Sequence, residues 1–284
     1  MPGFRRDATA LLVTAMVAAV PARAAAEEDE PAFLRDRGSG VATSMFGTYV
    51  RGRELLLYPF FEWYADSNYE YKPSELGYGV DVDYRGRYRA TEGLLFLGYG
   101  ITNDLALELE VAVIQARLEK AADDPSAQPA VVEESGLGDT QAQVRWRFLR
   151  EDVGRPEGFA YFETVFPLQK HRQLIGTRDW EYKLGFGVTK GFGFGTMTLR
   201  AAVEYSREEG KFEAGEYAIE YLRRLSRSWR IVALVEGVQL DEVELITEAQ
   251  WHFHRRAFLK LNMGWGLTPN ATDFAPEVGV MLSF

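Results

Sequence analysis

Three histidines, His171, His252 and His254, are the side chains in this sequence that most readily support acid–base catalysis or metal binding. His252 and His254 lie two residues apart, so in a strand they share one face with Glu244 and Glu248 and could join them in a metal site. The alternative, which we favour, is that these residues form a polar mouth at one end of the fold and bind no metal. A serine hydrolase needs a serine activated by a histidine that a third group holds, and no serine in the strands beside His171 lies in a recognisable motif.

A glycine-rich stretch at residues 191–195 is a further candidate, because glycine-rich loops can cradle phosphate groups. A phosphate-binding loop would continue with Lys-Ser or Lys-Thr, and neither follows here. The stretch is also expected to lie between two strands rather than before a helix. The sequence therefore predicts no enzyme, no bound metal and no cofactor.

The composition of the chain narrows its class. The 284 residues include no cysteine, which excludes disulfides, a cysteine-ligated metal and a lipid anchor on an N-terminal cysteine. The formal net charge is -10 and no basic tract is present, so nucleic acid is not an expected partner. An aromatic content of 13% and 27 glycines suit an all-β barrel or sandwich of many short strands.

The first residues have the pattern of a secretory signal peptide. Arg5 and Arg6 precede an apolar run at residues 8–20, and small residues at 21–26 offer two cleavage sites. The apolar run is too short to cross a bilayer as a helix, although a membrane anchor is the alternative. We predict a signal peptide at 1–26, a periplasmic N-terminal segment at 27–53 that is perhaps folded partly into the barrel, and a β-barrel at 54–284.

The clearest local pattern is an uninterrupted alternation over residues 138–148. Apolar residues that include Trp146 and Phe148 fall on one face of a strand, and Arg145 and Arg147 fall on the other. Segments of this kind recur about twelve times, and nearly all end in aromatic residues. The repetition predicts a transmembrane antiparallel up-and-down β-barrel with its apolar face in lipid and its charged face in a wet lumen. A water-soluble β-sandwich is the alternative, but it would explain only the strands.

Turn and loop signals divide the rest of the chain into about twelve strands. Longer connections follow odd-numbered strands and shorter ones follow even-numbered strands, so the longer ones are expected to be extracellular. The longest predicted loop is 120–134. The expected strands are 54–66, 79–101, one that begins at 105, 135–149, 158–167, 178–190, 196–208, 214–225, 229–240, 243–254, 257–268 and 275–284.

The inward face of these strands is expected to be rich in charge. An arginine that faced lipid at mid-membrane would cost roughly 2–4 kcal/mol. The arginines at 85, 87, 89, 145 and 147 are therefore assigned to the lumen, and Glu108 and Glu110 are their expected partners. Tyr58, Phe60 and Tyr64 are also assigned inward, either toward an apolar cargo or against the N-terminal segment. The predicted charged lumen residues are Asp81, Asp83, Arg85, Arg87, Arg89, Glu108, Glu110, Asp139, Arg145, Arg147, Glu181, Lys183, Glu204, Glu216, Glu220, Glu244, Glu248 and His252.

Aromatic residues at the strand ends predict two belts at the headgroup levels of a bilayer. The periplasmic belt comprises Trp146, Phe148, Trp229, Trp251 and Phe253, and the outer belt includes Trp180 and Trp265. The chain ends in Phe284 on an alternating last strand, which resembles the signal read by the outer-membrane barrel-assembly machinery. We therefore predict that lipid of the outer membrane of a Gram-negative bacterium and this machinery are partners.

Two short motifs resemble a known family. Gly136-Leu137-Gly138-Asp139, followed by Arg147-Phe148, resembles the Gly-x-Gly-Asp strand of the MetA-pathway of phenol degradation family of outer-membrane proteins. Residues 99–104 are similar to that family's second hairpin, although residues 167–170 depart from its usual Pro-Thr-Gly-Asp-like run. The resemblance covers about residues 54–284. It implies a barrel that passes aromatic or other hydrophobic compounds and supplies no established catalytic residues.

Two functions remain open at this point. The first is a passive channel for small molecules, and the second is a non-conducting structural or surface barrel whose lumen charges are joined in salt bridges. Mixed charge on the inward face fits either of them.

Overall fold

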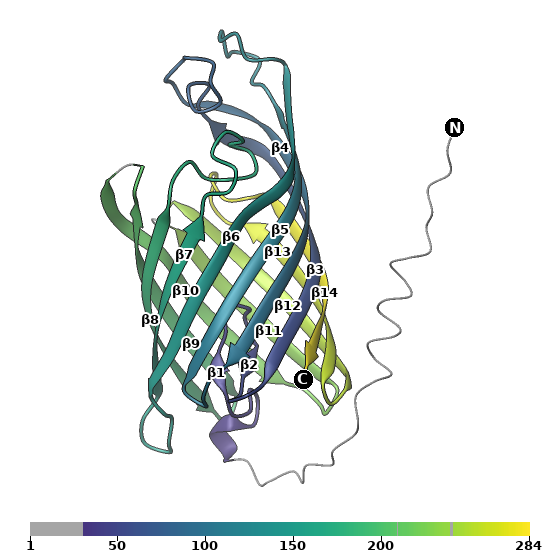
Figure 1. Ribbon diagram of the computed structural model, residues 1–284. Coiled ribbons are helices and arrows are strands. Elements are labelled where there is room, and N and C mark those ends of the chain that lie inside the picture. Colours follow the sequence, from purple (N-terminus) through teal and green to yellow (C-terminus); the bar gives the residue numbers. More distant parts are fainter. Residues whose placement is uncertain (1–30, 209, 239–240) are drawn as a thin grey trace.

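Residues 31–208, 210–238 and 241–284 are described by the computed structural model, so the predicted signal peptide lies outside the described residues. Twelve strands, β3 to β14, form one closed antiparallel barrel, which confirms the predicted fold class and strand number (Figure 1). Each strand pairs with the next along the chain, and β14 closes the barrel on β3. No helix in the described part of the chain is long and apolar enough to cross a membrane.

The strands alternate between buried and exposed positions because one face lines the lumen and the other faces outward. Short turns such as 193–194 and 255–256 lie at the end of the barrel where the chain terminates, here called the short-turn end (Figure 1). The opposite end is called the long-loop end. The barrel strands are β3 Leu55–Tyr71, β4 Tyr84–Gly100, β5 Leu105–Glu119, β6 Val131–Leu149, β7 Glu157–Phe166, β8 Glu181–Phe192, β9 Gly195–Ser206, β10 Lys211–Arg224, β11 Trp229–Val238, β12 Glu242–His254, β13 Ala257–Gly266 and β14 Phe274–Ser283.

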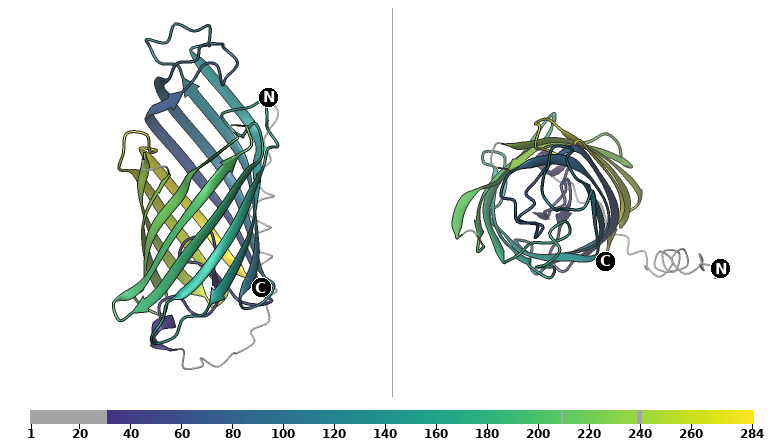
Figure 2. Two further views of the ribbon diagram at one scale, coloured as in Figure 1. Left: turned by 90° about the vertical axis from the view of Figure 1, so that its left-hand side faces the viewer. Right: turned by 90° about the horizontal axis from the view of Figure 1, so that it is seen from above.

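Four consecutive strands are longer than a bilayer requires. β3 to β6 contain 17, 17, 15 and 19 residues, whereas a membrane-spanning strand needs about 9–11. They rise beyond the other strands at the long-loop end (Figure 2, left). The sequence predicts a loop that begins at residue 67 and another loop that ends at residue 134. In the structure β3 continues to Tyr71 and β6 already begins at Val131, so both loops are shorter than predicted. Cross-strand rings stabilise this extension: Tyr69 stacks on Tyr88 with ring centroids 4.6 Å apart.

The predicted belt residues lie on the outward face. Trp146 and Trp251 keep 55% and 44% of their surface exposed, as expected for side chains that would contact lipid. Trp229 and Trp251 are paired across β11 and β12 and stack with centroids 6.3 Å apart. Phe148, Phe253 and Trp265 are exposed as well, and Trp180 packs edge-on against Phe166. Contact of these rings with lipid stays a prediction.

The N-terminal segment lies largely inside the barrel. After a short 3-10 helix, η1 (Ala32–Leu34), the strands β1 (Val41–Ala42) and β2 (Tyr49–Val50) pair as a small hairpin in the lumen near the short-turn end (Figure 2, right). We call residues 41–50 the lumen hairpin. The sequence favoured a periplasmic position for 27–53 with partial insertion; the lumen hairpin is inserted, whereas η1 lies at the short-turn rim (Figure 1).

Two apolar clusters lie on the inner wall at different heights. The lower one joins Val41 and Val50 of the lumen hairpin to wall residues that include Tyr58, Phe60 and Phe96. The upper one covers the inner face of the extension and holds Leu174 and Ile175 of the β7–β8 loop, among others. The lower cluster fixes the hairpin against β3 and β4, and the upper one folds a loop over the long-loop end.

Candidate functional site: the barrel lumen and its hairpin

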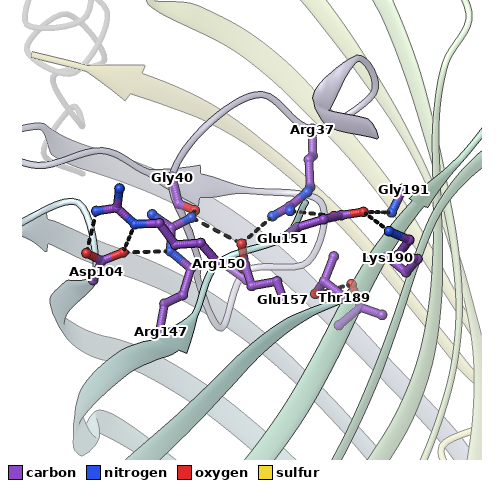
Figure 3. A network of polar contacts seen from close by, with 12 residues as sticks. Arg37, Gly40, Asp104, Arg147, Arg150, Glu151, Glu157, Thr189, Lys190 and Gly191 are labelled. Carbon is purple, nitrogen blue, oxygen red and sulfur yellow. Dashed lines mark hydrogen bonds and ion pairs between the residues drawn. The ribbon is translucent and has the colours of Figure 1, made fainter. Parts of the chain in front are cut away.

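The base of the lumen hairpin is held by a buried network of charges (Figure 3). Arg37 donates hydrogen bonds to Glu157 at 3.0 Å and to Glu151 at 2.8 Å, and all three residues are buried. Glu157 also accepts a hydrogen bond from Arg147 at 3.1 Å. Glu151 forms an ion pair with Lys190 at 3.2 Å. Two carboxylates of the barrel therefore compensate three cations, one of which belongs to the inserted segment.

Arg147 extends this network to the turn between β4 and β5. Its Nε donates to Asp104 at 2.9 Å, while its Nη1 donates to the backbone carbonyl of Gly40 just before the lumen hairpin. Hydrogen bonds from Arg150 and Arg147 hold the pKa of Asp104 below its usual range. A carboxylate with a lowered pKa stays ionised in mild acid, and its contribution is lost only as the pH falls through the lowered value. This part of the network is therefore expected to persist at mildly acidic pH.

The tip of the lumen hairpin contacts the wall through polar groups. The backbone N–H of Ser44 donates to Glu108 at 2.9 Å, and Gln250 donates to the carbonyl of Gly47 at 3.2 Å. Gly47 has a φ of +62°, and a Cβ there would lie 2.7 Å from Val232, so the turn requires glycine for both its conformation and its space. Lys260 donates to the carbonyl of Phe46 at 3.4 Å. These contacts place the hairpin across the lumen rather than along one wall.

Open space remains beyond the tip of the hairpin. The lumen holds a cavity of about 190 Å³ whose floor is formed by Ser44, Met45 and Phe46. Its walls carry charges of both signs, so it is a wet space rather than an apolar pocket. The wall residues are Phe96, Glu108, Leu109, Glu110, Gln141, Gln143, Glu163, Lys183, Arg200, Glu216 and Glu236.

Most of the residues predicted to face the lumen do so. Arg145 and Arg147 are buried on the inner wall, and Arg145 forms an ion pair with Glu108 at 3.5 Å, as expected. Tyr58 and Phe60 pack in the lower apolar cluster with the hairpin, so of the two alternatives for these rings the structure favours packing over contact with cargo. The inward set also includes Tyr64, Glu110, Asp139, Glu181, Lys183, Glu204, Glu216, Glu220, Glu244, Glu248 and His252.

Five predicted lumen residues lie elsewhere. Asp81 and Asp83 are in the loop between β3 and β4. Arg85, Arg87 and Arg89 are exposed on the outward face of the extension, because the residues that alternate with them, Tyr84, Gly86 and Tyr88, turn inward. The membrane cost that argued for an inward position does not apply there, since the extension lies beyond the length that a bilayer needs. Arginine on this surface can meet water and outward carboxylates.

Outward carboxylates do pair with two of these arginines. Arg85 forms an ion pair with Glu70, and Arg87 lies 3.9 Å from Glu119. Glu119 and Glu133 also pair with Arg117. Glu108 and Glu110 are therefore not partners of the β4 arginines.

The aspartate of the Gly-x-Gly-Asp motif organises a loop. Asp139 accepts hydrogen bonds from the backbone N–H groups of Leu168 and Gln169 at 2.8 and 3.2 Å, and from the hydroxyl of Thr177 at 2.7 Å. It therefore fixes both ends of the β7–β8 loop beside the lumen. A Cβ at Gly138 would lie 2.7 Å from Ile114, which explains the glycine that precedes it.

The histidines lie in different surroundings, and His252 and His254 form no metal-binding group with the glutamates considered for it among the described residues. His252 stacks on Phe258 with ring centroids 4.4 Å apart, and His171 is exposed in the β7–β8 loop. Within the described ranges, no three His, Asp or Glu side chains are grouped so that they could hold a metal ion.

Several lumen residues are missed by the sequence pattern. Glu62 lies within an aromatic strand that is apolar on both faces, and Glu92 lies where the alternation of β4 breaks down. Arg37 lies in a segment without any period. Only the closed barrel shows that these residues share one interior with Glu163, Glu236 and Glu277.

Comparison with known proteins shows similarity of fold. No family model and no curated protein matches this sequence, so the resemblance to the phenol degradation family stays a prediction. The COG4313 outer membrane channel from Pseudomonas putida F1 superposes with a TM-score of 0.58 at 15% identity, over 83% of this chain and 97% of that one. The KdgM porin gives 0.53 at 10% identity, over 81% and 99%. The translocator domain of autotransporter NalP from Neisseria meningitidis gives 0.52 at 11%, over 82% and 90%.

Proposed function

We propose that this protein is an outer-membrane channel for small molecules, with a lumen that the N-terminal hairpin partly fills. The observation that carries the proposal is the charged cavity beyond the hairpin, enclosed by a barrel whose outward face is apolar with aromatic residues near both ends. The two similar barrels described as a channel and a porin agree with this in fold. Aromatic or other hydrophobic cargo is what the resemblance in sequence implies. Secretion with a cleaved signal peptide and residence in the outer membrane belong to the same proposal.

The test is a planar-bilayer recording of the purified full chain. Discrete conductance steps are the expected result, since the cavity walls carry charge that water and ions can solvate. Complete absence of conductance from heat-modifiable, folded barrel would contradict the proposal.

A non-conducting structural barrel is the second candidate, because one observation favours it. The buried ion pairs around Arg37, Glu151 and Glu157 hold the inserted segment in place and would lock the wall. The same recording distinguishes the two candidates, since a structural barrel would remain silent at every voltage.

The last residue gives a prediction about assembly. Phe284 exchanges two backbone hydrogen bonds with Leu55, at 2.9 and 3.2 Å, and so closes the seam between β14 and β3. We expect deletion of Phe284 to lower the amount of folded barrel in the outer membrane at native expression, through loss of both seam bonds and the terminal aromatic. The amount is measured by heat-modifiable migration on a gel. Phe284→Tyr keeps the ring and the backbone and is the control; equal amounts of all three proteins would refute the prediction.

A further inference from the structure

A row of carboxylates crosses one wall of the lumen. Glu277 on β14, Glu62 on β3 and Glu92 on β4 are direct cross-strand partners, Glu277 with Glu62 and Glu62 with Glu92. We call these three residues the acidic row. Like charges directly opposite each other on neighbouring strands destabilise a sheet, so such a row is unfavourable for the barrel alone. Glu110 on β5 interacts electrostatically with both Glu92 and Glu277 and adds a fourth carboxylate nearby.

The described ion pairs of the lumen do not include the acidic row. Among the described residues, the ion pairs of the lumen include no lysine or arginine within 4.0 Å of Glu62, Glu92 or Glu277. The wall six strands away is different. There Lys183 lies 3.3 Å from both Glu163 and Glu216, and Arg200 pairs with Glu216 and Glu236 at 2.6 and 2.5 Å. Each of those three carboxylates therefore has a cation within 4.0 Å, whereas the carboxylates of the acidic row have none among the described ion pairs.

A second observation at the end of the row is a buried amide without a hydrogen-bond partner. Asn262 on β13 is the cross-strand partner of Glu277, and it is only 6% exposed. Both polar atoms of its amide are buried without a hydrogen-bond partner. A buried amide without partners is unfavourable for the folded barrel, and a bound group that supplies hydrogen bonds would relieve this. The amide oxygen, like the carboxylates of the row, accepts them.

Aromatic rings beside the row suit a cation as well. Tyr58 on β3 donates a hydrogen bond to Glu277, and its ring faces Lys260, whose Nζ lies 5.0 Å from the ring centroid. The wall next to the row therefore already accommodates one ammonium group over an aromatic face. An ammonium group is attracted by carboxylates and by the faces of aromatic rings, and it needs no fixed set of ligands.

We infer that the acidic row and Asn262 make the lumen selective for cations, and that its cargo consists of small organic ammonium compounds. The inference rests on the proposed channel function and specifies its cargo. Negative side-chain rings and rows select cations in other pores by the same electrostatics. A carboxylate compound of the same size would be repelled by the acidic row.

The first test compares ion selectivity in planar bilayers by reversal potential in a potassium chloride gradient. The triple variant E62Q/E92Q/E277Q removes the charge of the row and keeps its shape. The matched control E70Q/E119Q/E133Q removes three carboxylates from the outward face of the extension. We expect a potassium-to-chloride permeability ratio of roughly five in the wild type and the control, and a ratio of about one in the row variant. Equal selectivity of the three proteins would overturn the inference while leaving the channel function intact.

The second test measures binding and does not depend on conductance. Titration calorimetry with benzylammonium chloride and sodium benzoate is done on the folded, detergent-solubilised full chain and both variants. We expect benzylammonium to bind the wild type and the control, at least tenfold more weakly to the row variant, and benzoate to bind none of them. If no protein conducts, the channel function fails; benzylammonium binding that depends on the row would still support a cation site. Equal binding of benzylammonium and benzoate, or benzylammonium binding that the row variant leaves unchanged, would overturn the inference of a cation site.

Discussion

Removal of residues 31–50 is expected to raise the conductance of the barrel about threefold or more, because a twelve-stranded barrel is wider than the eight-stranded size that side chains alone can fill. The lumen hairpin and its base now occupy that width at the short-turn end. Its two strands pair only with each other, so the barrel retains every strand pairing when they are removed. Wall groups such as Arg145, Glu108 and Glu220 lose partners, but water in the opened lumen can replace them.

An add-back experiment provides the control for this deletion. A synthetic peptide with the sequence of residues 31–50, added on the side of the short-turn end, should lower the conductance of the deletion variant again. A scrambled peptide of the same composition should not. If the deletion variant folds and conducts like the full chain, the hairpin does not restrict the path through the lumen.

The strand pattern was predictable because its cause is local. Alternation with a period of two is visible in each segment, and the number of strands and the outward position of Trp146, Trp251 and Phe253 follow from it. The same rule failed for Arg85, Arg87 and Arg89. In the extension the inner face is lined by tyrosines that pack against the β7–β8 loop, so the more polar face is the outer one.

The contents of the lumen could not be predicted, because they depend on contacts between distant parts of the chain. The contacts of Arg37 with Glu151 and Glu157 join residues more than a hundred positions apart. The acidic row likewise exists only once β14 closes on β3, which brings Glu277 next to Glu62. No local period marks either arrangement. The mixed charge of the inward face was visible in the sequence, but the separation of the ion pairs around Lys183 and Arg200 from the acidic row was not.

Glu157→Gln is expected to weaken the hold on the inserted segment and to increase the time that the lumen is open. Glu157 is 1% exposed and lies between the guanidinium groups of Arg37 and Arg147, at 3.0 and 3.1 Å. Removing one partner of a buried ion pair typically costs about 3–5 kcal/mol, and the remaining contacts of the arginines with Glu151 and Asp104 reduce this. A loss of about 2–3 kcal/mol corresponds to a roughly 30- to 150-fold rise in the population of the detached segment.

The measurement is the open probability of single channels, with limited proteolysis of the N-terminal segment as a second readout. Asp152→Asn is the matched control, since Asp152 is an exposed acidic residue of the same β6–β7 turn that forms an ion pair with the exposed Arg155 and accepts hydrogen bonds from the backbone N–H groups of Gly154 and Arg155, which the amide oxygen of asparagine can still accept. Surface pairs of this kind contribute about 0–1 kcal/mol, so this variant should behave like the wild type. Equal open probability and equal protection from protease in both variants would mean that the charges around Glu157 do not hold the segment. In that case the contacts of the hairpin tip with Glu108, Gln250 and Lys260 would have to account for its position, and a variant that removes them should open the lumen instead.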